Sequence, residues 1–92
     1  MNEDAIACQL IVVGRVQGVF FRDSARREAQ RRGVAGWAAN RPNGSVEIVL
    51  EGPASAVREV ASFCSRGPRG AEVTGVEVSD RQPEGLSGFH IR

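Results

Sequence analysis

The pattern of the sequence changes from that of a strand to that of a helix across Gly14-Arg15-Val16-Gln17-Gly18-Val19-Phe20-Phe21-Arg22. The preceding residues, 6–13, are mostly apolar at both odd and even positions, which is typical of a strand in the middle of a sheet. The following residues are rich in Arg and carry a narrow apolar stripe of Phe21, Ala25 and Ala29 at helical spacing. Residues 14–22 are therefore predicted to join a central strand to a helix.

Such a loop is suited to binding an anion. Gly14 and Gly18 allow the backbone to curve so that successive N–H groups point toward one spot. The helix that follows adds unpaired N–H groups and the positive end of its dipole. Arg22 stands at the start of this helix, and its forked guanidinium can donate two parallel hydrogen bonds to a phosphate or carboxylate. We interpret the stretch as a phosphate-binding loop.

The rest of the chain predicts alternating short strands and helices. Asp23 or Ser24 is expected to cap the first helix, and Gly33 to end it. Asn43-Gly44 predicts a hairpin turn, and Pro53 is suited to the first turn of a second helix. The predicted elements are strand 6–13, helix to 32, strand 34–41, strand 45–51, helix from 53 to about 65, strand 71–79 with a bulge near Gly75, and strand 89–92.

This order predicts an α+β fold of the ferredoxin-like split βαββαβ type. In that fold an antiparallel sheet carries two helices on one face, and here a short fifth strand follows. The 92 residues are expected to form one domain, 1–92, with residues 1–5 as a flexible tail. The fold by itself indicates no function.

Composition excludes several classes of function. The formal net charge of +1 argues against nucleic acid or an anionic membrane as partner, and no signal peptide or membrane span is visible, so we expect a cytoplasmic protein. The chain has no Lys, which excludes Schiff-base chemistry and a Walker-type loop, and its single His disfavours a metal site. Cys8 and Cys64 lie in apolar patterns and are expected to be reduced core residues.

Asn40 is the polar residue that the predicted fold places nearest to the loop. It ends the second strand, and alternation puts its side chain on the same face as Ala38. An amide can accept a hydrogen bond from a water and donate to another group, so beside a bound phosphate it could position a hydrolytic water. The sequence places no His, Cys or carboxylate so that it could act as an acid, so such a site requires a good leaving group, and a carboxylate is one.

The whole chain resembles the acylphosphatase family. The resemblance is carried by Gly14–Arg22 together with Gly36–Asn40, Asn43–Glu47, Glu51–Gly52 and Gly88–Arg92. It implies hydrolysis of small-molecule acyl phosphates to a carboxylate and inorganic phosphate, with no metal and no cofactor. By position Arg22 resembles the phosphate-binding arginine and Asn40 the water-orienting asparagine of the family. Backbone N–H groups of the substrate-binding residues Arg15, Val16, Gln17, Gly18 and Val19 would contact the phosphate.

Two residues depart from the pattern that this family commonly shows. The strand before the asparagine more often resembles Trp-Val-Arg-Asn or Trp-Val-Lys-Asn, whereas here it is Trp37-Ala38-Ala39-Asn40. We expect the missing cation at Ala39 to weaken the attraction of an anionic substrate, and the smaller Ala38 to loosen the support beneath Asn40. Both changes are expected to alter affinity or stability rather than abolish activity.

Two other functions are alternatives to acyl phosphate hydrolysis. One is a non-catalytic phosphate- or carbamoyl-phosphate-binding module of the same fold, which would normally belong to a longer polypeptide, so that the length of 92 residues favours the enzyme. The other is an RNA-binding sheet, which the near-neutral charge and scarce aromatic residues disfavour. The role of Arg15 stays open between a substrate contact and a surface charge. A monomer is expected.

Overall fold

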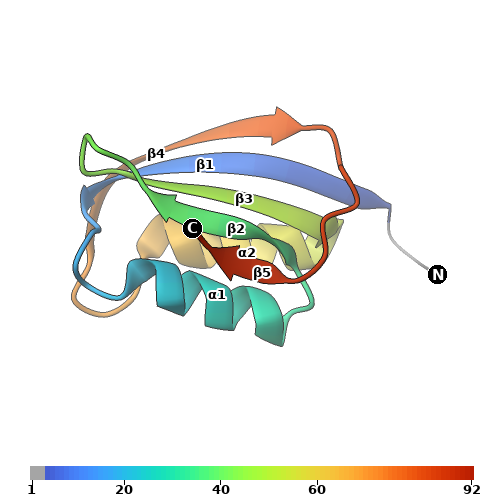
Figure 1. The fold of residues 1–92 in the computed structure, drawn as a ribbon, viewed down its shortest axis with the longest axis horizontal. Coiled ribbons are helices and arrows are strands. Elements are labelled where there is room, and N and C mark those ends of the chain that lie inside the picture. The colour runs from blue at the N-terminus through green and yellow to red at the C-terminus, as the bar shows by residue number, and fades with distance from the viewer. Residues whose placement is uncertain (1–3) are drawn as a thin grey trace.

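The computed structural model describes residues 4–92, and in this range it contains five strands and two helices (Figure 1). Their order confirms the predicted βαββαβ arrangement with a short fifth strand. β1 begins at Ala5, inside the predicted tail, of which residues 1–3 lie outside the described range. The elements are β1 (Ala5–Arg15), α1 (Phe21–Arg31), β2 (Ala35–Asn40), β3 (Val46–Pro53), α2 (Ala54–Arg66), β4 (Glu72–Arg81) and β5 (Phe89–Ile91).

The strands form one sheet in the order β4-β1-β3-β2-β5, and both helices cover the same face of it (Figure 1). β1 lies inside the sheet between β4 and β3, as its apolar residues on both faces predicted. The first four strands pair antiparallel, whereas β5 pairs parallel with β2. The fold is therefore the expected α+β ferredoxin-like sandwich, with a sheet that is mixed at the β5 edge.

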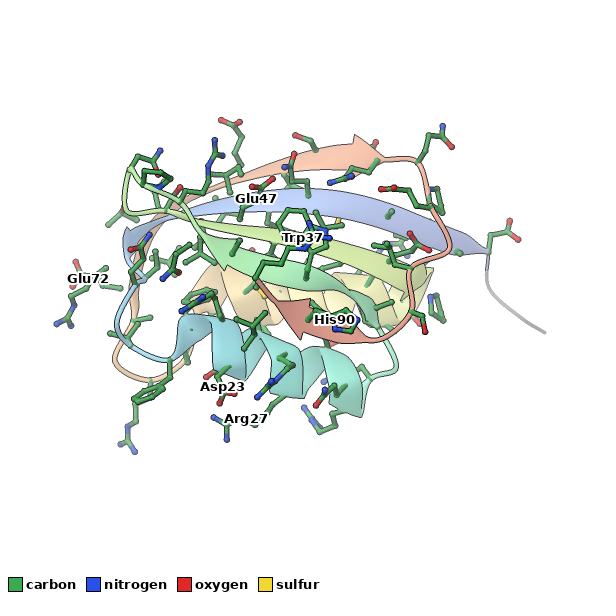
Figure 2. The ribbon with its side chains drawn as sticks, in the orientation of Figure 1. Asp23, Arg27, Trp37, Glu47, Glu72 and His90 are labelled. Atoms are coloured by element: carbon green, nitrogen blue, oxygen red, sulfur yellow. The ribbon has the colours of Figure 1, made fainter. Side chains whose placement is uncertain are left out.

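The two faces of the sheet differ in their surroundings. Asp23 and Arg27 project from α1 on one side, whereas Trp37 and Glu47 lie on the sheet (Figure 2). The β2–β3 register pairs Trp37 with Val49 and Ala39 with Glu47, so these residues share the face away from the helices. Neither described helix has the length and hydropathy that crossing a membrane requires.

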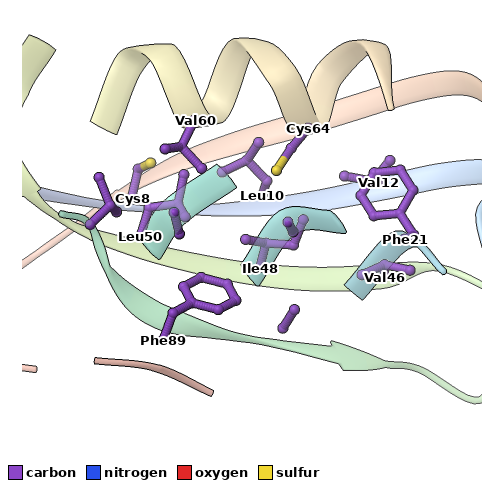
Figure 3. Close-up of a cluster of buried hydrophobic side chains, with 14 of the residues drawn as sticks. Cys8, Leu10, Val12, Phe21, Val46, Ile48, Leu50, Val60, Cys64 and Phe89 are labelled. Atoms are coloured by element: carbon purple, nitrogen blue, oxygen red, sulfur yellow. The ribbon is translucent and has the colours of Figure 1, made fainter. Parts of the chain in front are cut away.

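The hydrophobic core lies between the sheet and the two helices (Figure 3). The predicted stripe on α1 is confirmed, because Phe21, Ala25 and Ala29 are buried. Two alanines in this stripe let the helix approach the sheet closely. The sheet and α2 contribute Leu10, Val12, Val46, Ile48, Leu50, Val57, Val60 and Cys64.

Both cysteines are unpaired and buried in this core, as the sequence predicted. Burial raises the pKa of the Cys64 thiol to about 12 and, together with Asp80, raises the pKa of Cys8. The two thiols are therefore protonated at neutral pH and behave as small apolar groups.

β4 contains the predicted bulge near Gly75. Val13 pairs with Gly75 while the next residue, Gly14, pairs with Val73, so Thr74 is the extra residue on β4. The bulge brings the backbone of β4 so close to Gly14 that a Cβ there would lie 2.1 Å from the carbonyl oxygen of Glu72. Gly14 is thus required by strand packing, and of the two glycines expected to curve the loop only Gly18 lies in it.

Glu51 holds the β4–β5 connection against the sheet. Its carboxylate accepts hydrogen bonds from the backbone N–H groups of Glu84, Gly85 and Leu86 at 2.8, 2.8 and 2.9 Å. These bonds, that of Glu84 first, lower the pKa of Glu51 although burial opposes them. Local sequence does not reveal that Glu51 is buried, because the connection that covers it comes from a distant part of the chain.

Candidate active site

A pocket of about 330 Å³ lies where the β1–α1 loop meets the ends of β2 and β5. It brings together two residues that sequence analysis singled out for catalysis, Arg22 and Asn40. The residues that line it are Val16, Gly18, Phe20, Phe21, Arg22, Asp23, Asn40 and Ile91.

The N-terminus of α1 opens onto this pocket. The helix begins at Phe21, and Phe20 before it adopts a left-handed conformation with φ 58° and ψ 31°. The expectation that Asp23 or Ser24 caps the helix is therefore wrong, since the chain enters the helix earlier and makes no side-chain cap. The first helical hydrogen bond runs from Ser24 N to Phe20 O at 3.0 Å. The N–H groups of Phe21 and its next two neighbours thus have no acceptor within the helix and can bind an anion.

Arg22 is fixed by the C-terminal end of β5. Its Nη1 donates to the main-chain oxygen of Arg92 at 3.0 Å, and the N–H of Arg92 donates to Ala38 O at 2.8 Å. The guanidinium of Arg92 stacks on the ring of Trp37, 4.3 Å from its centroid. The bond to Arg92 uses one of the five N–H donors of the Arg22 guanidinium, so donors remain for a ligand. The sequence does not reveal this contact, because the acceptor is a main-chain oxygen 70 residues away.

Asn40 lies at the open end of the helix-covered face. It is the last residue of β2, paired with Val46, and Ala38 two residues earlier is fully buried in the core. Alternation along β2 therefore turns Asn40 toward the pocket, as the sequence predicted. Its side chain is exposed and makes no hydrogen bond to another residue in the range 4–92. The amide is available to a ligand or a water.

Gln17 ties the loop to the β2–β3 turn. Its Nε2 donates to the main-chain oxygens of Arg41 at 2.8 Å and Ser45 at 2.9 Å. The turn is closed by Asn43, whose Oδ1 accepts from the N–H of Ser45 at 3.1 Å and from its hydroxyl at 2.6 Å. Gln17 thereby fixes the loop against the residues that flank Asn40, a function that its position in the sequence did not reveal.

The other predicted substrate-binding residues separate into two groups. Val16 and Gly18 line the pocket, whereas the side chains of Arg15, Gln17 and Val19 do not. Arg15 is exposed at the end of β1, opposite Glu72 at the far edge of the molecule in Figure 2. Val19 packs against the core.

Asp23 places a carboxylate at the edge of the pocket, where it would repel an anion. Its oxygens pair with Arg26 at 2.6 Å and with Arg27 at 3.0 Å, and Figure 2 shows Asp23 beside Arg27. These ion pairs offset the repulsion. Further along the helix Glu28 pairs with Arg31 and Arg32, whose hydrogen bonds lower its pKa. Arg26, Arg27, Arg31 and Arg32 are thus ion-paired with carboxylates of α1 itself.

No three His, Cys, Asp or Glu side chains among residues 4–92 gather closely enough to hold a metal ion. His90 is exposed on β5 beside Trp37 and its Nε2 lies 2.9 Å from Ser87 O, so it does not line the pocket. Arg22, Asn40 and the α1 N-terminus offer the pocket hydrogen bonds to an anion and to water.

The two departures in β2 have different surroundings. Ala38 is fully buried beneath the site. Ala39 faces away from the pocket and lies opposite Glu47, which accepts a hydrogen bond from Gln9. A cation at position 39 would therefore lie beside Glu47, on the face opposite the pocket. This placement removes the structural basis for the expectation that its loss weakens substrate attraction.

A family model, curated proteins and solved structures that are similar to this chain share one family name. A family model described as Acylphosphatase matches residues 8–91. A curated protein named Acylphosphatase from Haloquadratum walsbyi is 48% identical over 92 residues, which cover 100% of this chain and 99% of the relative. The crystal structure of acylphosphatase from Bacillus subtilis is 40% identical with a TM-score of 0.90, and the match covers 95% of this chain and 98% of that one. HypF of T. kodakarensis is 29% identical with a TM-score of 0.79 over 94% of this chain, but only 11% of its own.

Proposed function

Because the chain belongs to the acylphosphatase family, whose members hydrolyse acyl phosphates, we propose that the pocket containing Arg22 and Asn40 is its active site. The reaction converts an acyl phosphate and water into a carboxylate and inorganic phosphate. One observation carries the proposal: the open N-terminus of α1 with its Arg22, and on β2 the Asn40 amide, which has no partner among residues 4–92, line one pocket.

The phosphate group binds at the N-terminus of α1. Backbone N–H groups of the loop from Arg15 to Val19 and of the first helical turn surround it, and Arg22 donates two hydrogen bonds from its fork. The hydrogen bond from Arg22 to Arg92 O holds the guanidinium in place before substrate arrives. This preorganisation stabilises the charge that develops on the phosphoryl oxygens in the transition state.

Asn40 orients the water in line with the bond that breaks. The water oxygen forms a bond to phosphorus, the bond from phosphorus to the acyl oxygen breaks, and its electron pair leaves with the carboxylate. A phosphoryl oxygen of the substrate takes the proton of the water, so no protein base is needed. A carboxylate leaves without protonation, which fits a pocket in which no side chain acts as a general acid.

Hydrolysis of benzoyl phosphate in the presence of a chelator tests the proposal. We expect the parent to be active, and Arg22→Ala to lower kcat/KM by about 10²–10³-fold, as removal of one transition-state donor does in other enzymes. Asn40→Ala is expected to lower mainly kcat. Arg58→Ala, which removes an exposed arginine of α2 outside the pocket, is the matched control and should leave the rate unchanged.

The alternative is a binding module that holds phosphate without hydrolysing it. The match to HypF of T. kodakarensis supports this alternative, because a unit similar to this chain forms only 11% of that much longer chain. A parent that binds inorganic phosphate through Arg22 but hydrolyses no acyl phosphate would establish the module and contradict the enzyme. The monomeric state and cytoplasmic location expected from the sequence stay predictions, and light scattering would test the first.

A further inference from the structure

Phe20 is unusual in both backbone and side chain. Its φ of 58° is the only positive value at a non-glycine residue in the range 4–92. Its side chain is 80% exposed, the highest value among the exposed large apolar residues described. A left-handed position is normally occupied by Gly or Asn. Because the phenyl ring stays exposed, it contributes no hydrophobic free energy to folding. Folding alone therefore does not account for a phenylalanine here.

Phe20 lines the pocket that contains Arg22 and Asn40. The lining divides chemically into an apolar part and a polar part, which is formed by Arg22, Asn40, the α1 N-terminus and, at the edge, the ion-paired Asp23. The apolar part includes Val16, Phe20 and Ile91, of which Val16 is buried while Ile91 is 37% exposed. A ligand that fills both parts must carry an anionic end and an apolar end.

The size of the pocket agrees with such a ligand. Its volume of about 330 Å³ corresponds to roughly eleven waters at about 30 Å³ each. A phosphate group has only five non-hydrogen atoms and would fill part of this space. The exposed apolar side chains of Phe20 and Ile91 line the same space.

We infer that Phe20 and Ile91 form the binding site for the acyl group, and that the preferred substrates are acyl phosphates with an aromatic or extended apolar acyl group. The inference rests on the proposed function, which places the phosphate at Arg22. Phe20 then contacts the acyl group through its ring, and Ile91 adds an aliphatic surface from β5. Aromatic side chains favour aromatic partners in offset or edge-to-face contact.

The test compares kcat/KM for benzoyl phosphate and acetyl phosphate. We expect the parent to prefer benzoyl phosphate and Phe20→Ala to reduce that preference about fivefold to tenfold, with acetyl phosphate changed less than about twofold. Phe20→Tyr should keep the preference, and Ile91→Ala should reduce it by a smaller factor. Val78→Ala removes an exposed apolar side chain of β4 outside the pocket and should change neither substrate.

Two further measurements separate this inference from folding and from the proposed function. Phe20→Asn relieves the backbone strain, so it should be at least as stable as the parent and still lose the preference. Phenylphosphonate should bind the parent more tightly than methylphosphonate, and Phe20→Ala should abolish the difference, whether or not turnover occurs. If Phe20→Ala changed kcat/KM equally for both substrates, so that their ratio stayed the same, the acyl-group site would be overturned. The proposed roles of Arg22 and Asn40 would be unaffected. Absence of turnover with retained phenylphosphonate preference would overturn the enzyme alone.

Discussion

Gly14 and Gly18 stand four residues apart and meet different steric requirements. Gly14 has φ 127° in β1, and a Cβ there would meet backbone atoms of β4. Gly18 has φ 74° in the loop, and nothing lies within 4 Å of the position a Cβ would occupy. The first glycine is needed for close approach of two strands and the second only for its backbone conformation.

Gly14→Ala should therefore destabilise the protein far more than Gly18→Ala. The overlap with Glu72 O at 2.1 Å forces β4 to move, which we expect to cost ~3 kcal/mol or more. Gly18→Ala meets only the left-handed penalty of about 1–2 kcal/mol. Urea denaturation measures both values. Similar losses for the two variants would contradict this account.

At the scale of elements, the site depends on how the β1–α1 loop is attached to the β2–β3 turn. The loop has no side-chain cap on α1, and Gln17 supplies the attachment through two hydrogen bonds to main-chain oxygens. Because Arg41 and Ser45 flank the pair Asn40–Val46, the bonds of Gln17 fix the distance between the phosphate-binding loop and the water-orienting amide.

Gln17→Ala is expected to lower stability by about 1–2 kcal/mol, since one exposed and one half-buried hydrogen bond are lost. It should also lower kcat severalfold because Asn40 loses its fixed position relative to the loop. Gln17→Glu keeps the shape but points a carboxylate at two carbonyl oxygens, and should be worse in both respects. Denaturation curves and steady-state kinetics on the same preparations test this; full activity in Gln17→Ala would show that the turn holds Asn40 without it.

At the scale of the whole molecule, β5 connects the opposite face of the sheet with the pocket. Glu51 holds the β4–β5 connection, and β5 in turn places Ile91 in the pocket and Arg92 against Arg22. A carboxylate on β3 thereby supports a guanidinium on α1 through a strand that is last in sequence.

The protein should become less stable in acid because the Glu51 carboxylate is protonated there. Its pKa in the folded protein is lowered below the ordinary value of 4.5, so its contribution is complete above that value and is lost as the pH falls through the folded pKa. Glu51→Gln should cost about 1–3 kcal/mol at pH 7, and the difference from the parent should shrink below about pH 4.5. Denaturation from pH 3 to 7 measures it. A difference that stays constant with pH would contradict the role of the charge.

The buried thiols give a second test of the whole fold. With the pKa of Cys64 raised to about 12 and that of Cys8 also raised, neither cysteine should react with iodoacetamide at pH 8 in the folded state. Both should react in denaturant. Rapid modification of the folded protein would show that the core opens locally.

The sequence by itself determined the order of the elements, the fold class, the buried stripe of α1, the bulge in β4 and the face of β2 on which Asn40 lies. These follow from local periodicity, turn residues and alternation along a strand, which depend on neighbouring residues only. The tertiary structure decided the helix start at Phe21, the need for a glycine at position 14, the bonds of Gln17, the burial of Glu51 and the contact of Arg92 with Arg22. The last four depend on backbone atoms of a segment distant in sequence, and a main-chain carbonyl or N–H group leaves no signal in residue type. The helix start depends on the left-handed backbone of Phe20, which a phenylalanine does not indicate.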